Sequence, residues 1–286
     1  MKIFTDMALD ADVSFIMKHE ISVIPATIVS AGEEKKYSLE DIDKESLKEF
    51  FVSMKKGSLP QTRALDKEAF ASNFEPVLSK GEDVLYISVA SELTSSSAAF
   101  DETVKELKVK FPDRKVERFD SCSASVGMTA LIHGLKEETS ESAGITVDEA
   151  LAKLTELRKN LSGYFIIEDM FHMRRGGKYK GADIVTANAM KIRPIMSIND
   201  EGIIENVSKQ RGTGMAMAYM ADKVAGELSG KSGITVFISH VNSEEKAEKF
   251  KDLLIERGVT AEYSISSMGP VTGTHVGPGG IAVAYL

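Results

Sequence analysis

Four consecutive hydroxyl side chains, Thr94 to Ser97, give the chain its clearest chemical signal. They follow a hydrophobic strand that ends near Ala90 and open the next predicted helix. There, free backbone N–H groups and the positive end of the helix dipole favour an anion. Capping alone would need only one of the hydroxyls. The run therefore indicates either a site for a carboxylate or phosphate, or ordinary helix capping.

Two further polar segments lie next to predicted strands. The stretch from Thr5 to Asp10 follows the first strand, and we expect Asp6 to accept backbone N–H bonds in the turn that follows. The carboxyl edge of a parallel sheet is also where open α/β folds place their ligands. In residues 59–63, Pro60 keeps the chain extended in front of the hydroxyl of Thr62. Both segments are candidate parts of a binding site.

The single cysteine lies in another segment of this kind. Ser121, Cys122 and Ser123 stand between the end of a strand and the next helix. A cysteine nucleophile at a helix start needs a general base, and no neighbouring histidine or acid points to one. We therefore expect Cys122 to be a buried structural thiol.

A histidine stands in a run of small residues, TGTHVGPGG, just before the last predicted strand. Gly277, Gly279 and Gly280 let the backbone of this loop pass close to another group, and Pro278 stiffens it. A lone histidine is more often structural than a ligand. The bare loop around His275 nevertheless makes it a candidate for the site.

Several common sites lack their sequence markers. The segment GELSGKS, residues 226–232, closes a helix and is one residue too short for a phosphate loop, so it predicts a turn. The five histidines show no paired metal-ligand spacing. Neither a GxGxxG motif after a strand nor a GxSxG motif is present. We expect no metal and no cofactor.

The elements that would position these residues alternate between short β-branched runs and amphipathic helices, which is typical of βαβ units. In the first half, strands are predicted at 2–5, 22–29, 84–89 and 115–119, and helices at 44–56, 67–78, 95–110 and 125–139. A hairpin turn is predicted near Gly32, and a bridging helix at 147–160.

The second half predicts a mixed sheet. Its strands are expected at 164–167, 192–198, 203–208, 235–239, 261–265 and 281–285, with helices at 214–227 and 244–256. A turn over residues 199–202 makes one strand pair antiparallel. The fold class is therefore α/β, with a mainly parallel N-terminal domain (1–160) and a mixed C-terminal domain (161–286).

Composition supports this organisation, since 286 residues correspond to two domains at roughly 150 residues each. The net charge of −8 without a long basic run argues against nucleic acid and anionic membrane surfaces as partners. One cysteine, no signal-peptide pattern and no apolar run of about 20 residues predict a cytoplasmic protein without stable membrane insertion. The 13 Met and 13 Phe, including Met215, Met217 and Met220, either fill the core or line a cavity.

Taken in order along the whole chain, these segments resemble the motifs of the DegV family. This family of fatty-acid-binding proteins includes the FakB subunits of bacterial fatty acid kinases. The matching elements are Thr5-Asp6-Met7 for TDS, Pro60-Gln61-Thr62-Arg63 for P-x-T-S, Leu93-Thr94-Ser95-Ser96 for LSGT, Asp120-Ser121 for DS, Gly176-Gly177-Lys178 for GGR, Ile192-Arg193-Pro194-Ile195 for IKPI, and His275-Val276-Gly277-Pro278-Gly279 for H-x-GPG.

The resemblance implies two α/β domains, with a long acyl chain buried in a tunnel between or within them. It further implies that the protein is not itself an enzyme. The bound fatty acid would be presented to a separate fatty acid kinase, which phosphorylates the carboxyl group for phospholipid metabolism. The implied ligand-binding residues are Thr62, Arg63, Thr94, Ser95, Ser96 and His275, with Asp6, Ser121, Gly277 and Gly279 as supporting candidates.

Three of these positions depart from the family motifs. Arg63 replaces a serine and adds a fixed positive charge, which would grip a carboxylate or point to solvent. Thr94 replaces a serine, and Ser95 replaces a glycine, which loses a close backbone approach but adds a hydroxyl. All three lie at the implied head-group site, so they bear on the ligand more than on the fold.

The alternative function is that of a Ser/Thr-dependent acyl hydrolase or transferase. Its nucleophile would be Ser121 or a residue of the run Thr94 to Ser97, with His275 as the base and Asp6 or Asp120 orienting it. This mechanism requires the nucleophile and the base to lie within hydrogen-bond reach.

Basic residues of the second domain form a candidate docking surface for the kinase. Lys178, Arg193, Lys209 and Arg211 would meet an acidic patch on that partner. The alternative interpretation is an ordinary solvated face.

Overall fold

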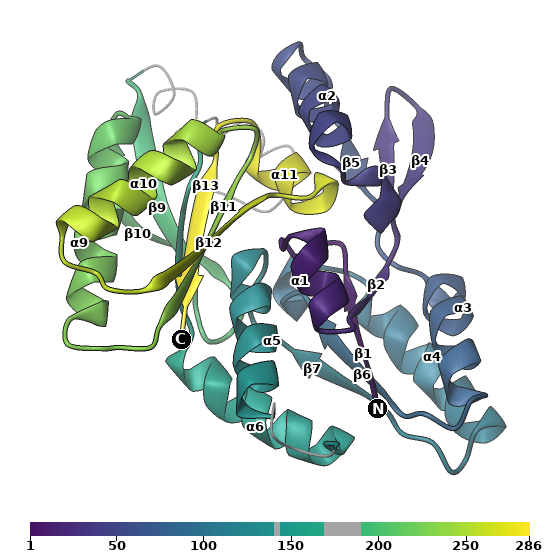
Figure 1. Ribbon diagram of the computed structural model, residues 1–286. Coiled ribbons are helices and arrows are strands. Elements are labelled where there is room, and N and C mark those ends of the chain that lie inside the picture. The colour runs from purple at the N-terminus through teal and green to yellow at the C-terminus, as the bar shows by residue number, and fades with distance from the viewer. Residues whose placement is uncertain (140–143, 169–189) are drawn as a thin grey trace.

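A four-stranded parallel sheet forms the centre of the N-terminal part (Figure 1). The computed structural model describes residues 1–139, 144–168 and 190–286. The strands β1 (Lys2–Asp6), β2 (Ser22–Ile24), β6 (Val84–Ser88) and β7 (Val116–Asp120) lie in the order β2-β1-β6-β7. Since the order reverses between β1 and β6, their carboxyl ends border the crevice where such sheets bind ligands.

Helices cover both faces of this sheet. On one face, α3 (Lys67–Leu78) and α4 (Ser97–Lys110) enclose a core rich in aromatic rings, including Phe70, Phe74 and Tyr86. On the other face lie α1 (Val13–Lys18), α5 (Val126–Glu138) and α6 (Val147–Asn160). The helix α5 has a second role, because it also packs against β11 and β13 of the other sheet.

A small antiparallel sheet extends from this part of the molecule. It contains β3 (Ala26–Ser30), β4 (Glu33–Tyr37) and β5 (Gln61–Thr62), and the chain forms η1 (Leu39–Asp41) and α2 (Lys44–Lys55) between β4 and β5. The predicted strand 22–29 is divided into two strands of different sheets at Pro25. Pro25 has no N–H to donate to a sheet, and the chain leaves the parallel sheet there to begin β3. The predicted turn at Gly32 is confirmed.

The second sheet is six-stranded and mixed. Its strands, β8 (Ser162–Ile166), β9 (Ile192–Ile198), β10 (Ile204–Arg211), β11 (Thr235–His240), β12 (Glu262–Ser267) and β13 (Ile281–Tyr285), lie in the order β10-β9-β8-β13-β11-β12. β11 and β12 are parallel, and the other neighbours are antiparallel. The predicted fold class, parallel in the first part and mixed in the second, is confirmed. The boundary at residue 160 stays a prediction.

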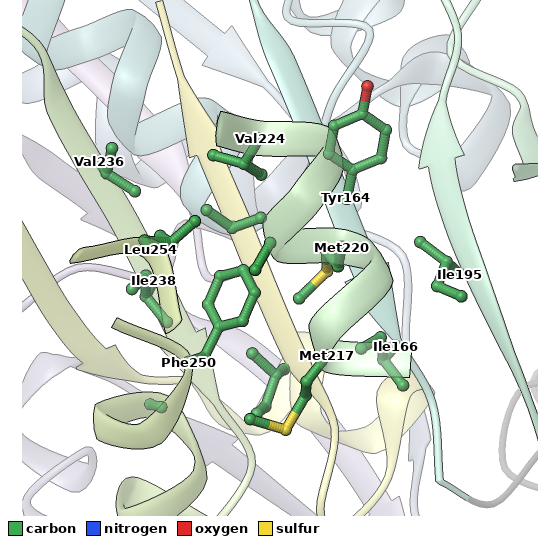
Figure 2. Packing of buried hydrophobic residues seen from close by; sticks show 14 of the residues in the cluster. Tyr164, Ile166, Ile195, Met217, Met220, Val224, Val236, Ile238, Phe250 and Leu254 are labelled. Atoms are coloured by element: carbon green, nitrogen blue, oxygen red, sulfur yellow. The ribbon is translucent and has the colours of Figure 1, made fainter. Parts of the chain in front are cut away.

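Two helices cover one face of the mixed sheet, α9 (Thr213–Leu228) and α10 (Glu244–Glu256). Figure 2 shows Met217 and Met220 of α9 within this core, beside Phe250 and Ile238. These methionines are therefore core residues and do not line a ligand cavity, while Met215 is 61% exposed. The opposite face of the sheet looks toward α5 (Figure 1).

One short helix near the C-terminus departs from the expected loop. The residues around His275 form α11 (Pro270–Val276), with Pro270 in its first turn. The composition of this stretch is poor for a helix, because glycine and threonine have low helix propensity. Tertiary packing supports it instead. Gly273 lies so close to Phe51 of α2 that a Cβ at this position would overlap the ring.

Candidate functional site

A cavity of about 620 Å³ lies between the two sheets. This volume is in the range of small-molecule sites, roughly 300–1,000 Å³. It is bordered by the carboxyl ends of β1 and β6, which is the crevice that the strand order predicts. Its other walls are residues 59–65, the loop 93–96 ahead of α4, the start of α5, helix α11, and the inner faces of β8 and β13.

Two polar side chains from opposite ends of the sequence meet at this cavity. The hydroxyl of Thr62 on β5 lies 3.1 Å from Nε2 of His275, which stands in the last turn of α11. Both residues line the cavity, and both are half-buried. A carboxylate at this point would find a hydroxyl and an imidazole side by side, which is a favourable pair of hydrogen-bond donors.

Three residues of the hydroxyl run reach the same cavity, whereas Ser97 is not part of its wall and accepts a hydrogen bond from Arg118 at 2.7 Å. Thr94, Ser95 and Ser96 line the cavity, and the Thr94 hydroxyl donates to Oγ of Ser96 at 3.0 Å. Ser96 Oγ also accepts the N–H of Leu65 at 2.9 Å, which ties α4 to the segment that carries Thr62. Ser96 makes no side-chain cap on α4. Capping of that helix therefore does not explain the run.

Arg63 points away from this group of hydroxyls. Its guanidinium forms an ion pair with Glu34 on the neighbouring strand β4, and its side chain is 58% exposed. Its backbone N–H donates to the carbonyl of Thr27 at 2.9 Å, which extends the small sheet past Thr62. Arg63 therefore lies at the rim of the cavity. Its guanidinium contacts the hairpin formed by β3 and β4 and not the hydroxyls.

Asp6 holds the loops at the end of the parallel sheet. Its carboxylate accepts the N–H of Ala8 at 2.9 Å, the N–H of Val89 at 3.2 Å and the hydroxyl of Tyr86 at 2.7 Å. Burial raises the pKa of Asp6, and these three hydrogen bonds oppose that shift. The predicted role of accepting backbone N–H bonds is confirmed.

The other supporting candidates lie away from the cavity wall. Ser121 is fully buried and uses its hydroxyl in the turn to Ser123, accepting that residue's N–H at 3.1 Å. Gly277 and Gly279 have positive φ angles and shape the turn after α11. A Cβ on Gly279 would overlap the Glu168 carboxylate, so glycine is required there for packing.

The cysteine falls outside the cavity. Cys122 is half-buried, and Arg158 donates a hydrogen bond to its sulfur at 3.4 Å. Burial and the nearby Asp120 carboxylate raise the pKa of the thiol, which disfavours a nucleophilic thiolate.

The three candidate docking residues that the structure describes also lie apart from the cavity wall. Lys209 and Arg211 are exposed on β10, and Arg193 is half-buried on the adjacent strand β9. Lys178 lies outside the described residues.

Sequence reasoning missed a buried polar network behind the cavity. The Asp10 carboxylate accepts the hydroxyl of Ser125 at 2.5 Å and the N–H of Gly269, at the start of α11, at 2.6 Å. Ser125 in turn bonds Ser239 of β11 at 2.9 Å. Ser125 also has a φ of 57°, which is unusual for a serine. The sequence feature that indicates this network is Asp10, an acidic residue that stands between apolar residues shortly after a strand.

Two features that other functions would need are missing from the described residues. Among them, no group of three or more histidine, cysteine, aspartate or glutamate side chains is arranged to hold a metal ion. Within the same part of the chain, no helix is both long and apolar enough to cross a membrane.

Comparison with protein families assigns the whole chain. The family model described as "Uncharacterised protein, DegV family COG1307" matches residues 1–286. The chain belongs to the DegV family. Among its DegV relatives is a DegV domain-containing protein of Clostridium perfringens, 25% identical over 285 residues, covering 99% of this chain and 96% of the relative.

Solved structures of proteins named for fatty acid or lipid binding share this fold. A fatty-acid-binding DegV protein of Thermus thermophilus aligns with a TM-score of 0.85 at 21% identity, covering 99% of this chain and 98% of the other. A stearic-acid-binding protein of Eubacterium ventriosum aligns with a TM-score of 0.87 at 20% identity, covering 99% and 97%. A DegV lipid-binding protein of Thermotoga maritima gives 0.84 at 24% identity, covering 99% and 97%.

Proposed function

We propose that this DegV protein binds a long-chain fatty acid, with its acyl chain in the cavity between the sheets and its carboxylate at the Thr62–His275 pair. The observation that carries the proposal is the cavity itself, which has apolar walls and a cluster of hydroxyls and one histidine at a single place. A solved DegV protein and a solved stearic-acid-binding protein, both named for fatty acids, share the fold. Burial of alkyl groups drives binding at about 0.8 kcal/mol per CH₂.

The head-group residues follow from the same geometry. A buried carboxylate is costly unless it is hydrogen-bonded, and Thr62, Thr94, Ser96 and His275 all line the cavity. Ser96 is also hydrogen-bonded to Leu65, in the segment that carries Thr62. The exposed ion pair of Arg63 with Glu34 argues against a direct grip by that guanidinium. We therefore assign the carboxylate to the hydroxyls and the imidazole.

The first experiment identifies the ligand. Protein purified under native conditions is denatured and extracted into organic solvent, and the extract is analysed by mass spectrometry. The expected result is about one fatty acid per chain. Delipidated protein should also gain thermal stability with palmitate or oleate. Absence of lipid together with absence of stabilisation would refute the proposal.

The second experiment tests the head-group site. Thr62→Val and His275→Asn should each weaken fatty acid binding about tenfold or more, because a hydrogen bond to a charged group contributes about 1.5–3 kcal/mol. Thr155→Val, on the exposed face of α6, is the matched control and should bind as the wild type does. If both site variants bind fatty acid as tightly as the wild type, the carboxylate is not bound by Thr62 and His275.

We further propose that the bound fatty acid is presented to a separate kinase that phosphorylates its carboxyl group. Arg211 is an exposed member of the candidate docking surface. Arg211→Glu should reduce acyl phosphate formation by a cognate kinase at unchanged lipid content. Lys231→Glu, an exposed charge reversal beyond the far end of α9, should leave transfer unchanged. If Arg211→Glu and Lys231→Glu support acyl phosphate formation equally well, Arg211 is not part of the docking surface.

The Thr62–His275 pair also supports the alternative of an acyl hydrolase. The hydrogen bond of 3.1 Å places a hydroxyl beside a base, as nucleophilic catalysis requires. The hydroxyl is that of Thr62, not one of the expected nucleophiles Thr94 to Ser97 or Ser121. Turnover of acyl esters that is lost in His275→Asn would favour the hydrolase. Bound fatty acid without turnover favours the binding protein.

A further inference from the structure

The last strand of the mixed sheet has large residues on one face and small residues on the other. Ile281, Val283 and Tyr285 of β13 belong to the core beneath α9 and α10. Ala282 and Ala284, which alternate with them, line the cavity between the sheets. Successive side chains of a strand point to opposite faces, so the small residues are confined to the cavity side.

On the neighbouring strand β8, Tyr164 and Ile166 lie in the α9–α10 core, as Figure 2 shows, whereas Gly163 and Phe165 alternate with them on the cavity side. Gly163 pairs directly with Ala284 across the two strands. Gly163, Ala282 and Ala284 therefore form a patch of small residues, called here the trough, and Phe165, which pairs with Ala282, borders it. Buried faces are normally filled by large apolar side chains, and a patch without them leaves space for a ligand.

The trough runs away from the head-group site. Val276, next to His275, lies so close to Gly280 that a Cβ there would overlap it, so β13 begins beside the end of α11. Ala284 stands two residues further than Ala282 along β13, a distance of about 7 Å. An acyl chain with its carboxylate at His275 would thus pass Ala282 before it reaches Ala284.

Leu161 closes the far end. It precedes β8, lies on the same face as Gly163, and lines the cavity. One of its methyl groups lies 3.8 Å from where a Cβ on Gly127 of α5 would be. The side chain of Leu161 therefore extends from the sheet to the helix that covers the cavity.

We propose that the trough and Leu161 set the longest acyl chain that this protein accepts. Ala284 and Gly163 leave room for the terminal carbons, and Leu161 stops them. This inference rests on the proposed fatty acid binding and names the residues that determine its length specificity.

The test uses delipidated protein and a series of saturated fatty acids from 10 to 20 carbons, with affinity measured by calorimetry. For the wild type, affinity should rise with chain length to an optimum and then fall. Ala284→Leu should shorten the optimum by two or more carbons, with about a fourfold loss for each excluded CH₂. Leu161→Ala should lengthen the optimum by about two carbons.

A matched control stands on the same strand. Ile281→Val removes a methylene on the opposite face, in the α9–α10 core and away from the cavity wall, and should leave the optimum length unchanged. Binding of the 10-carbon acid by Ala284→Leu within threefold of the wild type shows that the variant is folded. If Ala284→Leu binds no fatty acid, the test rests on Leu161→Ala. A longer optimum chain length in Leu161→Ala supports the proposal, and an unchanged optimum overturns it.

The outcomes also separate this inference from the proposed function. A wild type that binds no fatty acid of any length refutes the proposed function itself. A wild type with a clear optimum that neither variant moves retains the proposed function and overturns the assignment of the trough.

Discussion

Asp10 accepts hydrogen bonds from four residues, which belong to two other segments of the chain. Its carboxylate accepts hydrogen bonds from Ser125 and Gly269, and its backbone carbonyl accepts those of Thr129 at 2.8 Å and Ser266 at 3.3 Å. Only 1% of its surface is exposed. Burial raises the pKa of Asp10 to about 7, although the hydrogen bonds oppose the shift.

This pKa makes stability depend on pH in a defined direction. The native state holds the Asp10 proton more tightly than the unfolded state, whose pKa is 3.8. The stabilisation is complete below pH 4 and is lost as the pH rises to about 7. The loss amounts to at most about 4 kcal/mol. Replacement by asparagine removes the titrating group.

We expect the free energy of unfolding of the wild type to fall between pH 4.5 and pH 8 relative to that of Asp10→Asn. Urea unfolding at several pH values measures this difference. Asp101→Asn, at an exposed position of α4, is the control and should follow the wild type. The lowered pKa values of His19, His133 and His240 affect both proteins equally. Parallel pH profiles of wild type and Asp10→Asn would contradict the assignment.

At the scale of elements, α11 depends on one close approach. Gly273 of this helix faces the fully buried ring of Phe51 on α2. The first atoms of any larger side chain would meet that ring, and a rigid ring inside a packed core moves little. The position of α11, and with it that of His275, therefore depends on a glycine in the middle of a helix.

Gly273→Ala should destabilise the protein by about 1–3 kcal/mol through overpacking and weaken fatty acid binding by displacing His275. Gly226→Ala offers a control of opposite sign. Gly226 lies in the interior of α9 with nothing within 4 Å of where the new methyl group would lie, and alanine is the better helix former there by about 0.5–1 kcal/mol. Thermal unfolding measures the stability of both variants, and calorimetric titration measures their affinity for fatty acid. Equal stability of the two would exclude a tight contact at Phe51.

The same two elements show what a sequence can predict. The sequence predicts helices 67–78, 147–160 and 244–256 to the residue, because each shows apolar periodicity. It does not predict helix α11, whose support comes from Phe51, more than 200 positions earlier in the chain. Periodicity describes an element's own residues and contains no information about a distant partner.

The residues of the candidate site also fall into two groups, those that local sequence predicts and those that depend on distant contacts. Local composition and the family resemblance predict Thr62 and His275, and the structure brings them within 3.1 Å. Asp10 and Ser125 were missed because their importance arises from contacts among loops far apart in the sequence. Arg63 is predicted near the ligand, but its partner Glu34 lies on a hairpin whose position only the fold determines.

At the scale of the whole molecule, the two sheets share structural support. Helix α5 packs on the parallel sheet and on β11 and β13 of the mixed sheet. Across this junction, Ser125 bonds Ser239 at 2.9 Å and His133 Nε2 lies 3.3 Å from the Thr235 hydroxyl. Neither sheet can unfold without exposing apolar surface on the other.

We therefore expect the chain to unfold in one cooperative transition, with no separate step for the proposed domains 1–160 and 161–286. Differential scanning calorimetry tests this, with agreement of calorimetric and van't Hoff enthalpies as the criterion. Saturation with fatty acid should raise the midpoint without splitting the peak, because a ligand between the sheets stabilises both. Two resolved transitions would instead mean that each part has its own independent stability.

The position of Phe165 is suited to a fluorescent probe of fatty acid binding in the cavity. The chain contains no tryptophan, so its intrinsic emission is dominated by tyrosine. Phe165 lines the cavity and pairs with Ala282, so it stands beside the trough. A Phe165→Trp variant would place a single indole against the bound acyl chain. Its emission should shift to shorter wavelength as fatty acid displaces water, so occupancy of the cavity can be followed in real time.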